Sequence, residues 1–159
     1  MGKYAKNTDV SSARSRAEIE DILMRYNASG FGYVRQNNTA MIAFMMENRQ
    51  LRFILPLPDP TDKEFTHTPN RGTLRSPEAQ RAEYEQAERQ RWRALALVIK
   101  AKLEAVECGI SEFEREFLGN IVLPDGNTAG DFMLPQIAQA YEYGTMPSLI
   151  PMLPDGRSS

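Results

Sequence analysis

The chain has 159 residues, of which 42% are hydrophobic and 25% are charged, and its formal net charge is −2. This length suits one domain of ordinary size, and the apolar fraction is too high for a wholly disordered chain. A single cysteine excludes an intrachain disulfide and a multi-cysteine zinc site, and no apolar run is long enough to predict a membrane-spanning helix.

The charges are unevenly distributed along the sequence. Residues 1–103 hold 17 Lys and Arg against 12 Asp and Glu, whereas residues 104–159 hold 2 against 9. A basic first part permits a face that binds nucleic acid. The same distribution equally permits two parts that attract each other, within one chain or between subunits.

The first expected element is a short helix. Residues 1–14 are polar and lack periodicity, so we expect a disordered N-terminal arm there. Ser15 and Glu18 then have the spacing of a capping box. The helix behind them carries one apolar stripe, and residues 27–30 are expected to end it; the stripe consists of Ile19, Ile22, Leu23 and Tyr26.

Three short strands are expected next, over residues 31–35, 39–46 and 50–55. Residues 31–35 are aromatic and β-branched, and turn-forming residues separate the three segments. Neither face of the second strand is polar, so we expect this strand to be central and covered on both sides. The pattern predicts a three-stranded antiparallel meander.

A proline-rich segment follows the strands. We expect residues 56–75 to form a long loop that carries His67, the only histidine. A lone loop histidine is more often structural or exposed than catalytic, and no nucleophile motif accompanies it. The sequence therefore predicts no catalytic residue, no metal site and no cofactor, and hence a protein that is not an enzyme.

The longest expected element is a helix over residues 77–108, opened by Ser76 and Pro77 and closed by Gly109. Its second half carries two apolar stripes on roughly opposite sides. We expect the bulky stripe to pack on the sheet, and it consists of Trp92, Leu95, Ile99, Leu103 and Val106. We expect the alanine stripe to pack against the C-terminal helices, and it consists of Ala94, Ala101 and Ala105.

A C-terminal helical segment completes the domain. Thr128 and Asp131 are expected to start its last helix, and Gly144 to end it. The elements together predict one α+β domain over residues 15–144: a short helix, a three-stranded antiparallel sheet, a long helix packed on the sheet and the C-terminal helical segment. We expect residues 145–159 to form a proline-broken tail.

Basic side chains flank the bulky stripe of the long helix. Arg89, Arg93 and Lys100 share one azimuth, and Arg91 and Lys102 share another. Rows of this kind can follow a phosphate backbone, and Arg52 on the third strand would extend the surface. The alternative is that these cations lie along apolar surface or pair with neighbouring glutamates.

Four segments of the sequence resemble a family of small bacteriophage and prophage proteins. They are FILPLP at 53–58, FTHT at 65–68, RQRWRALALVIKAKLEAVE at 89–107 and IVLPDG at 121–126. The resemblance implies action in the cytoplasm of a bacterial host, in phage DNA replication and recombination or against host defence. It carries over no catalytic residue.

Two functions are open at this point. The first is a non-enzymatic nucleic-acid-binding accessory protein of phage DNA replication or recombination. The second is a phage-encoded inhibitor that binds a host enzyme or defence effector through its acidic C-terminal part. Apolar residues of the tail would then anchor the partner, namely Met146, Leu149, Ile150 and Met152. A homo-oligomer is compatible with both functions.

Overall fold

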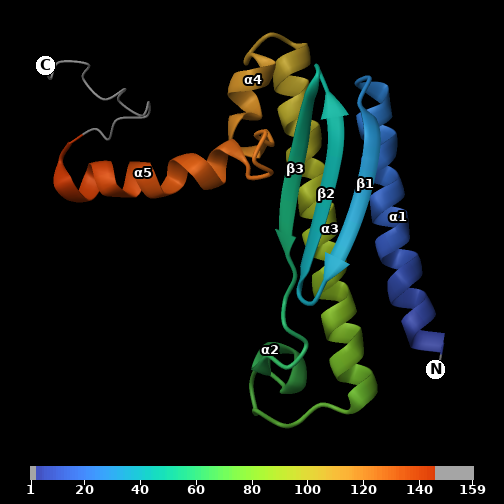
Figure 1. The fold of residues 1–159 in the computed structure, drawn as a ribbon. Helices are drawn as coiled ribbons and strands as arrows, with labels where there is room; N and C mark the ends of the chain where they lie inside the picture. Colours follow the sequence, from blue (N-terminus) through green and yellow to red (C-terminus); the bar gives the residue numbers. More distant parts are fainter. Residues whose placement is uncertain (1–2, 146–159) are drawn as a thin grey trace, which may run out of the picture.

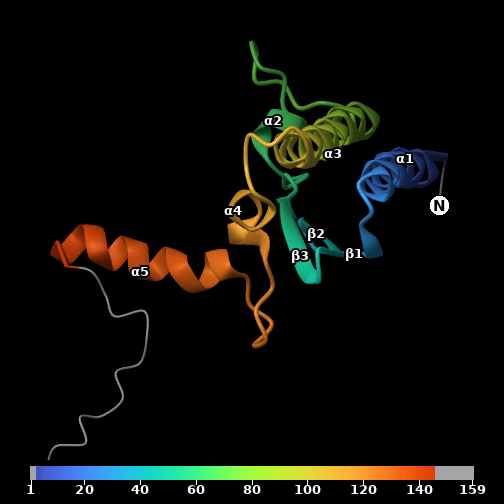
Figure 2. The same ribbon diagram turned by 90° about the horizontal axis from the view of Figure 1, so that it is seen from above.

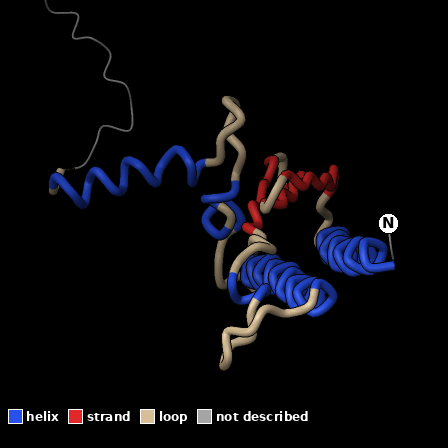
Figure 3. Tube along the Cα trace, turned by 90° about the horizontal axis from the view of Figure 1, so that it is seen from below, coloured by secondary structure: helices blue, strands red, loops and turns tan. Residues whose placement is uncertain are grey.

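Three strands and two long helices form two layers in the computed structural model, which describes residues 3–145, with side chains from residue 13 onward (Figure 3). Helices α1 and α3 lie on one face of the sheet, whereas α5 leads away from the sheet (Figures 1 and 2). This arrangement confirms the predicted α+β fold. The elements in chain order are α1 (Lys3–Arg25), β1 (Ser29–Gln36), β2 (Thr39–Met46), β3 (Arg49–Pro56), α2 (Lys63–Thr66), α3 (Pro77–Glu107), α4 (Phe113–Glu116), the 3-10 helix η1 (Leu118–Asn120) and α5 (Ala129–Tyr143).

The sheet is the predicted antiparallel meander, with β2 in the centre. Two-residue turns connect the strands, and Glu47 and Asn48 in the second turn both have positive φ values, of 50° and 58°. Turns of this kind match the natural twist of paired strands. The resulting register places Met41 opposite both Val34 and Ile54.

The hydrophobic core lies between the sheet and the helices. Trp92 and Ile99 of α3 are fully buried there, in one cluster with Ile42 and Phe44 of β2. This confirms that the bulky stripe packs on the sheet. Phe117, between α4 and η1, is also fully buried and meets the Phe53 ring edge-on, so the C-terminal part contributes to the same core.

Helix α1 is longer than the sequence predicted. It begins at Lys3 rather than after Ser15, so residues 3–14 are helical and the prediction of a disordered arm over 1–14 is wrong for them. No Gly or Pro interrupts residues 3–25. Once the packed turns around Ile19 are formed, each further residue can extend the helix at little cost.

The prediction that β2 is covered on both sides is wrong. Its residues Ala40, Ile42 and Phe44 are buried under the helices, but Met45 on the other face is 39% exposed. The second face is uncovered because α1 and α3 both lie on the same face of the sheet, and α5 points away from the sheet (Figure 2).

The alanine stripe of α3 also has a different environment from the one predicted. Ala94 and Ala101 are exposed, and Ala105 is half-buried. The C-terminal helices do not cover this stripe because α4 lies beside α3 and α5 extends away from it (Figure 1).

Two local predictions have clear outcomes. The segment 56–75 is not a loop throughout, because it contains α2 and a short antiparallel bridge between His67 and Leu74.

The start of α5 is as predicted, because the Thr128 hydroxyl accepts from the Asp131 amide and the Asp131 carboxylate accepts from the Thr128 amide. The anchors Met146, Leu149, Ile150 and Met152 lie outside the described residues.

Candidate nucleic-acid interface

Three of the six predicted nucleic-acid ligands form an exposed row on α3. Arg89, Arg93 and Lys100 lie about a quarter of a turn from the stripe that packs on the sheet. All three are exposed, and none makes a hydrogen bond or ion pair with the described side chains. At 1.5 Å per residue, the row extends for about 16 Å along the helix. We call Arg89, Arg93 and Lys100 the α3 basic row.

The surroundings of the α3 basic row are mixed. Leu97, 62% exposed, lies between its members, and the next residues along this flank are acidic. One of them, Glu104, accepts a hydrogen bond of 2.6 Å from the hydroxyl of Tyr26, the residue that follows α1. The basic surface on this flank therefore ends before the last turn of α3.

The other three predicted ligands have partners inside the molecule. Lys102 Nζ lies 3.3 Å from Glu116 Oε1 and donates to the Glu116 carbonyl at 3.1 Å. Arg52 donates to the Gly126 carbonyl at 2.9 Å, and its side chain is only 22% exposed. Arg91 is exposed and makes one long contact of 3.4 Å with the Pro56 carbonyl. The structure does not bring these three together with the α3 basic row.

The acidic C-terminal part pairs with the basic part of the same chain. Glu114 binds Arg49 at 2.9 Å, in addition to the Lys102–Glu116 pair. Asp131 lies 4.0 Å from Arg52. Of the two interpretations of the charge distribution, attraction between two parts of one chain is thus present in the structure. These are partly exposed pairs, so each contributes about 0.2–1 kcal/mol to stability.

A buried ion pair between the sheet and α3 is the polar feature that sequence reasoning missed. Arg35 Nη1 lies 2.6 Å from Glu88 Oε1, and the Glu88 side chain is 1% exposed. Burial opposes ionisation of Arg35, but the Glu88 carboxylate outweighs it and raises the pKa of the guanidinium. A signal was present in the sequence, because Glu88 lies four residues before Trp92 and so falls within the bulky stripe.

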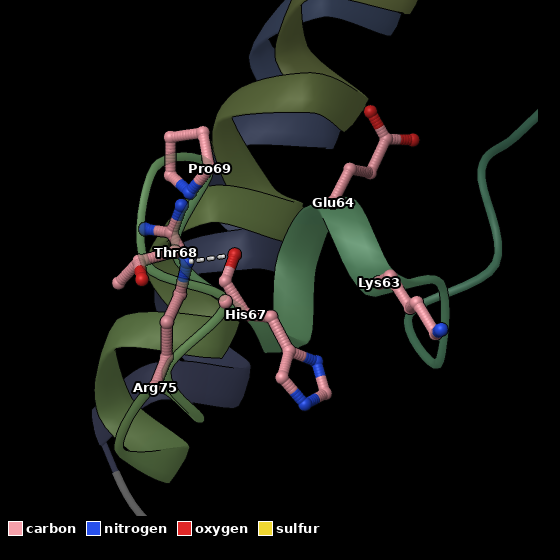
Figure 4. Close-up of a pocket in the computed structure, with 7 residues that line it drawn as sticks. Lys63, Glu64, His67, Thr68, Pro69 and Arg75 are labelled. Atoms are coloured by element: carbon pink, nitrogen blue, oxygen red, sulfur yellow. Dashed lines mark hydrogen bonds between the residues drawn. The ribbon is translucent and has the colours of Figure 1, made fainter.

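The segment around His67 lines an open hollow of about 650 Å³ (Figure 4). The Thr66 hydroxyl lies 2.7 Å from His67 Nδ1, and Arg75 donates to the His67 carbonyl at 3.1 Å while pairing with Glu83. The Glu64 carboxylate points away from the imidazole (Figure 4). Arg75 thus ties this segment to α3, and no carboxylate drawn in the hollow orients the histidine.

The α3 basic row is the strongest candidate site in the described part of the chain. Among the described residues, no cluster of three or more His, Cys, Asp or Glu side chains could hold a metal ion. Within residues 3–145, no helix combines the length and hydropathy needed to cross a bilayer. Comparisons with protein-family models, curated proteins and solved structures find no match for this chain. The resemblance to small phage proteins therefore stays a prediction.

Proposed function

We propose that the protein is a non-enzymatic, nucleic-acid-binding accessory protein of phage DNA replication or recombination, acting in the cytoplasm of a bacterial host. The α3 basic row carries the proposal, because Arg89, Arg93 and Lys100 are exposed and unpaired with the described side chains. Phosphate groups are the ligands that such a row of cations attracts.

The helix that carries the row supports this proposal. Trp92 and Ile99 anchor the same turns of α3 in the core, so the three cations project from a rigid backbone. Contacts of this type bind the phosphate backbone and do not read sequence. With three phosphate contacts, the logarithm of the binding constant should fall against the logarithm of salt concentration with a slope of about −2 to −3.

Binding of labelled single- and double-stranded DNA and RNA oligonucleotides, measured by fluorescence anisotropy over a range of salt concentrations, tests the proposal. We expect Arg89→Glu, Arg93→Glu and Lys100→Glu together to abolish binding while the circular dichroism spectrum is unchanged. A matched control reverses the charge of three exposed cations elsewhere, by Lys63→Glu, Arg71→Glu and Arg115→Glu.

The control separates a specific surface from net charge. If the control variant loses as much affinity as the α3 variant, binding depends only on total charge and the assignment of the row is wrong. If the unsubstituted protein binds none of the four nucleic acids at low salt, the proposed function itself is wrong.

The inhibitor hypothesis draws less support from the structure. Three of its acidic groups, Glu114, Glu116 and Asp131, lie beside cations of the same chain and so are partly neutralised. A host protein captured by the full chain from nuclease-treated lysate, and lost after truncation at Gly144, would favour this hypothesis over nucleic-acid binding.

A further inference from the structure

Helix α5 has an apolar stripe that nothing in the described part of the chain covers. Its side chains at three- and four-residue spacing are Leu134, Ile137 and Tyr141, which are 63%, 44% and 88% exposed. The helix packs mainly against η1 and then projects into open space (Figures 1 and 2). An amphipathic helix in water normally buries such a stripe against another element.

The sheet has a second uncovered apolar surface, on the face opposite α1 and α3. Val34, Met41 and Ile54 lie side by side across the three strands, and Val34 and Ile54 are each 52% exposed. Ala43 and Met45 continue this surface along β2. A shallow groove of about 360 Å³ lies at the end where Met41 meets Val34 and Ile54. We call this surface the open sheet face.

The two surfaces belong to one chain but do not meet within it. The start of α5 is fixed, because the Ala129 amide donates to the Ile121 carbonyl and Thr128 caps the helix. Gly130 also approaches Gly119 so closely that a Cβ atom built on it would lie 2.7 Å from the Gly119 oxygen. From this anchor, beside the edge of β3, α5 points away from the sheet (Figure 2).

We propose that α5 of one chain packs on the open sheet face of a second copy. In the resulting two-fold symmetric dimer, the α5 helix of each chain covers the open sheet face of the other. The dimensions agree, because fifteen residues of helix extend about 22 Å and eight residues of strand about 27 Å. A helix on this face also completes the layered arrangement in which both faces of a sheet are covered.

Charge and symmetry favour the same occupant. The charged residues of α5, Asp131 and Glu142, are both acidic and lie off the apolar stripe. The charged residue of the open sheet face is the cation Arg52, which donates to the Gly126 carbonyl and lies 4.0 Å from Asp131 of its own chain, so an apolar helix on this face would bury no unpaired cation. Two-fold symmetry forms the helix-on-sheet contact twice, which brings the buried area toward the roughly 1,200–2,000 Å² of stable dimers.

Two double variants test the exchange by measuring mass in solution with light scattering. Leu134→Asp with Ile137→Asp disables the helix, and Val34→Asp with Ile54→Asp disables the sheet face. We expect the unsubstituted protein to be a dimer and each variant to be a monomer. The matched control, Gln136→Asp with Gln139→Asp on the side of α5 opposite the apolar stripe, should remain a dimer.

Mixing the two monomeric variants then distinguishes this arrangement from simpler ones. Each pair of unlike chains retains one intact helix and one intact sheet face, so the mixture should form heterodimers that neither variant forms alone. Pairing of α5 with α5 would leave the sheet variant dimeric, and pairing of sheet with sheet would leave the helix variant dimeric. Either result overturns the proposal, as does a monomeric unsubstituted protein.

A cross-linking measurement keeps the proposal testable if an aspartate variant fails to fold. With the exposed Cys108 replaced by Ser, one chain carries Met41→Cys and the other Ile137→Cys. Oxidation of the mixture should give disulfide-linked pairs of unlike chains, and their absence overturns the proposal. The open sheet face lies opposite α3, so failure of this test leaves the proposed function of the α3 basic row unaffected.

Discussion

At the scale of single residues, the Arg35–Glu88 pair makes the sharpest prediction about stability. Glu88 is almost fully buried, whereas Arg35 keeps a third of its side chain in water. Arg35→Ala leaves a buried carboxylate without its guanidinium, and we expect a loss of about 3 kcal/mol of unfolding free energy, measured by urea denaturation.

The reciprocal substitution is the control for this pair. Glu88→Gln removes the charge but keeps the shape, and the remaining guanidinium can turn to solvent. We therefore expect a loss of only about 1 kcal/mol. Equal losses in the two variants would contradict the view that the cost comes from the buried carboxylate.

The contact between Tyr26 and Glu104 makes the stability of the fold depend on pH in the alkaline range. The hydrogen bond to Glu104, together with desolvation and the charge of that carboxylate, raises the pKa of Tyr26 above 10.0. Because the folded state holds this proton more tightly, the contribution to stability is complete below pH 10.0 and is lost as the pH rises through the folded value.

Titration of tyrosine absorbance tests this dependence. The difference between the unsubstituted protein and Tyr26→Phe isolates the phenol, which should ionise above pH 10.0. Glu104→Gln removes the carboxylate and should return the pKa toward its ordinary value. A Tyr26 titration unchanged by Glu104→Gln would show that the contact does not form in solution.

At the scale of elements, the close approach of α5 to η1 determines where α5 points. A Cβ on Gly130 would lie 2.7 Å from the Gly119 backbone oxygen, which has no flexible side chain to move aside. We expect Gly130→Ala to lower the unfolding free energy by about 2 kcal/mol, as overpacking of a fixed contact does. A thermal melt measures this change.

Gly119 supplies a matched control across the same contact. A Cβ built there has no atom within 4 Å, and its φ is not positive, so Gly119→Ala should leave the melting temperature almost unchanged. If both alanine variants melt at the same temperature as the unsubstituted protein, the approach of the two glycines is looser than the structure shows.

At the scale of the whole molecule, the ion pairs between the two oppositely charged parts predict a small dependence on salt. Replacing Glu114 and Glu116 by Gln removes the pairs with Arg49 and Lys102. These groups are partly exposed, so we expect the melting temperature at low salt to fall by about 2–4 °C, corresponding to about 1 kcal/mol.

Sodium chloride provides the corresponding measurement on the unsubstituted protein. Raising the concentration to about 0.5 M should remove a similar part of its stability, because salt screens exposed pairs. The Gln variant should respond less to the same change. An identical salt dependence in both proteins would mean that these pairs do not contribute.

Much of the fold was predictable because its signals are local. Alternating side chains and the short turns between them determined three paired strands, and the stripe through Trp92 and Ile99 determined a long helix packed on the sheet. The ends of α5 followed from Thr128 and Gly144 in the same way. Each of these signals lies within a few residues, where backbone geometry relates sequence directly to structure.

The candidate sites depend on contacts between residues that are far apart in the sequence. The periodicity of side chains within one segment does not predict such contacts. The α3 basic row was predicted from its spacing, but only the folded chain showed that Lys102 and Arg52 pair with Glu116 and with Gly126. Arg35 and Glu88 are 53 residues apart, and their approach follows from the packing of α3 on the sheet.

The sequence by itself determined the three strands, the long helix α3 with its buried side and the ends of α5, because side-chain periodicity and capping residues identify these features. Only the tertiary structure decided which face of the sheet remains open and where α5 points. Those outcomes depend on the side to which each connection carries the next element, and on one close backbone approach between Gly119 and Gly130. The residues of one element alone do not predict these outcomes, because each depends on a connection to, or a contact with, another part of the chain.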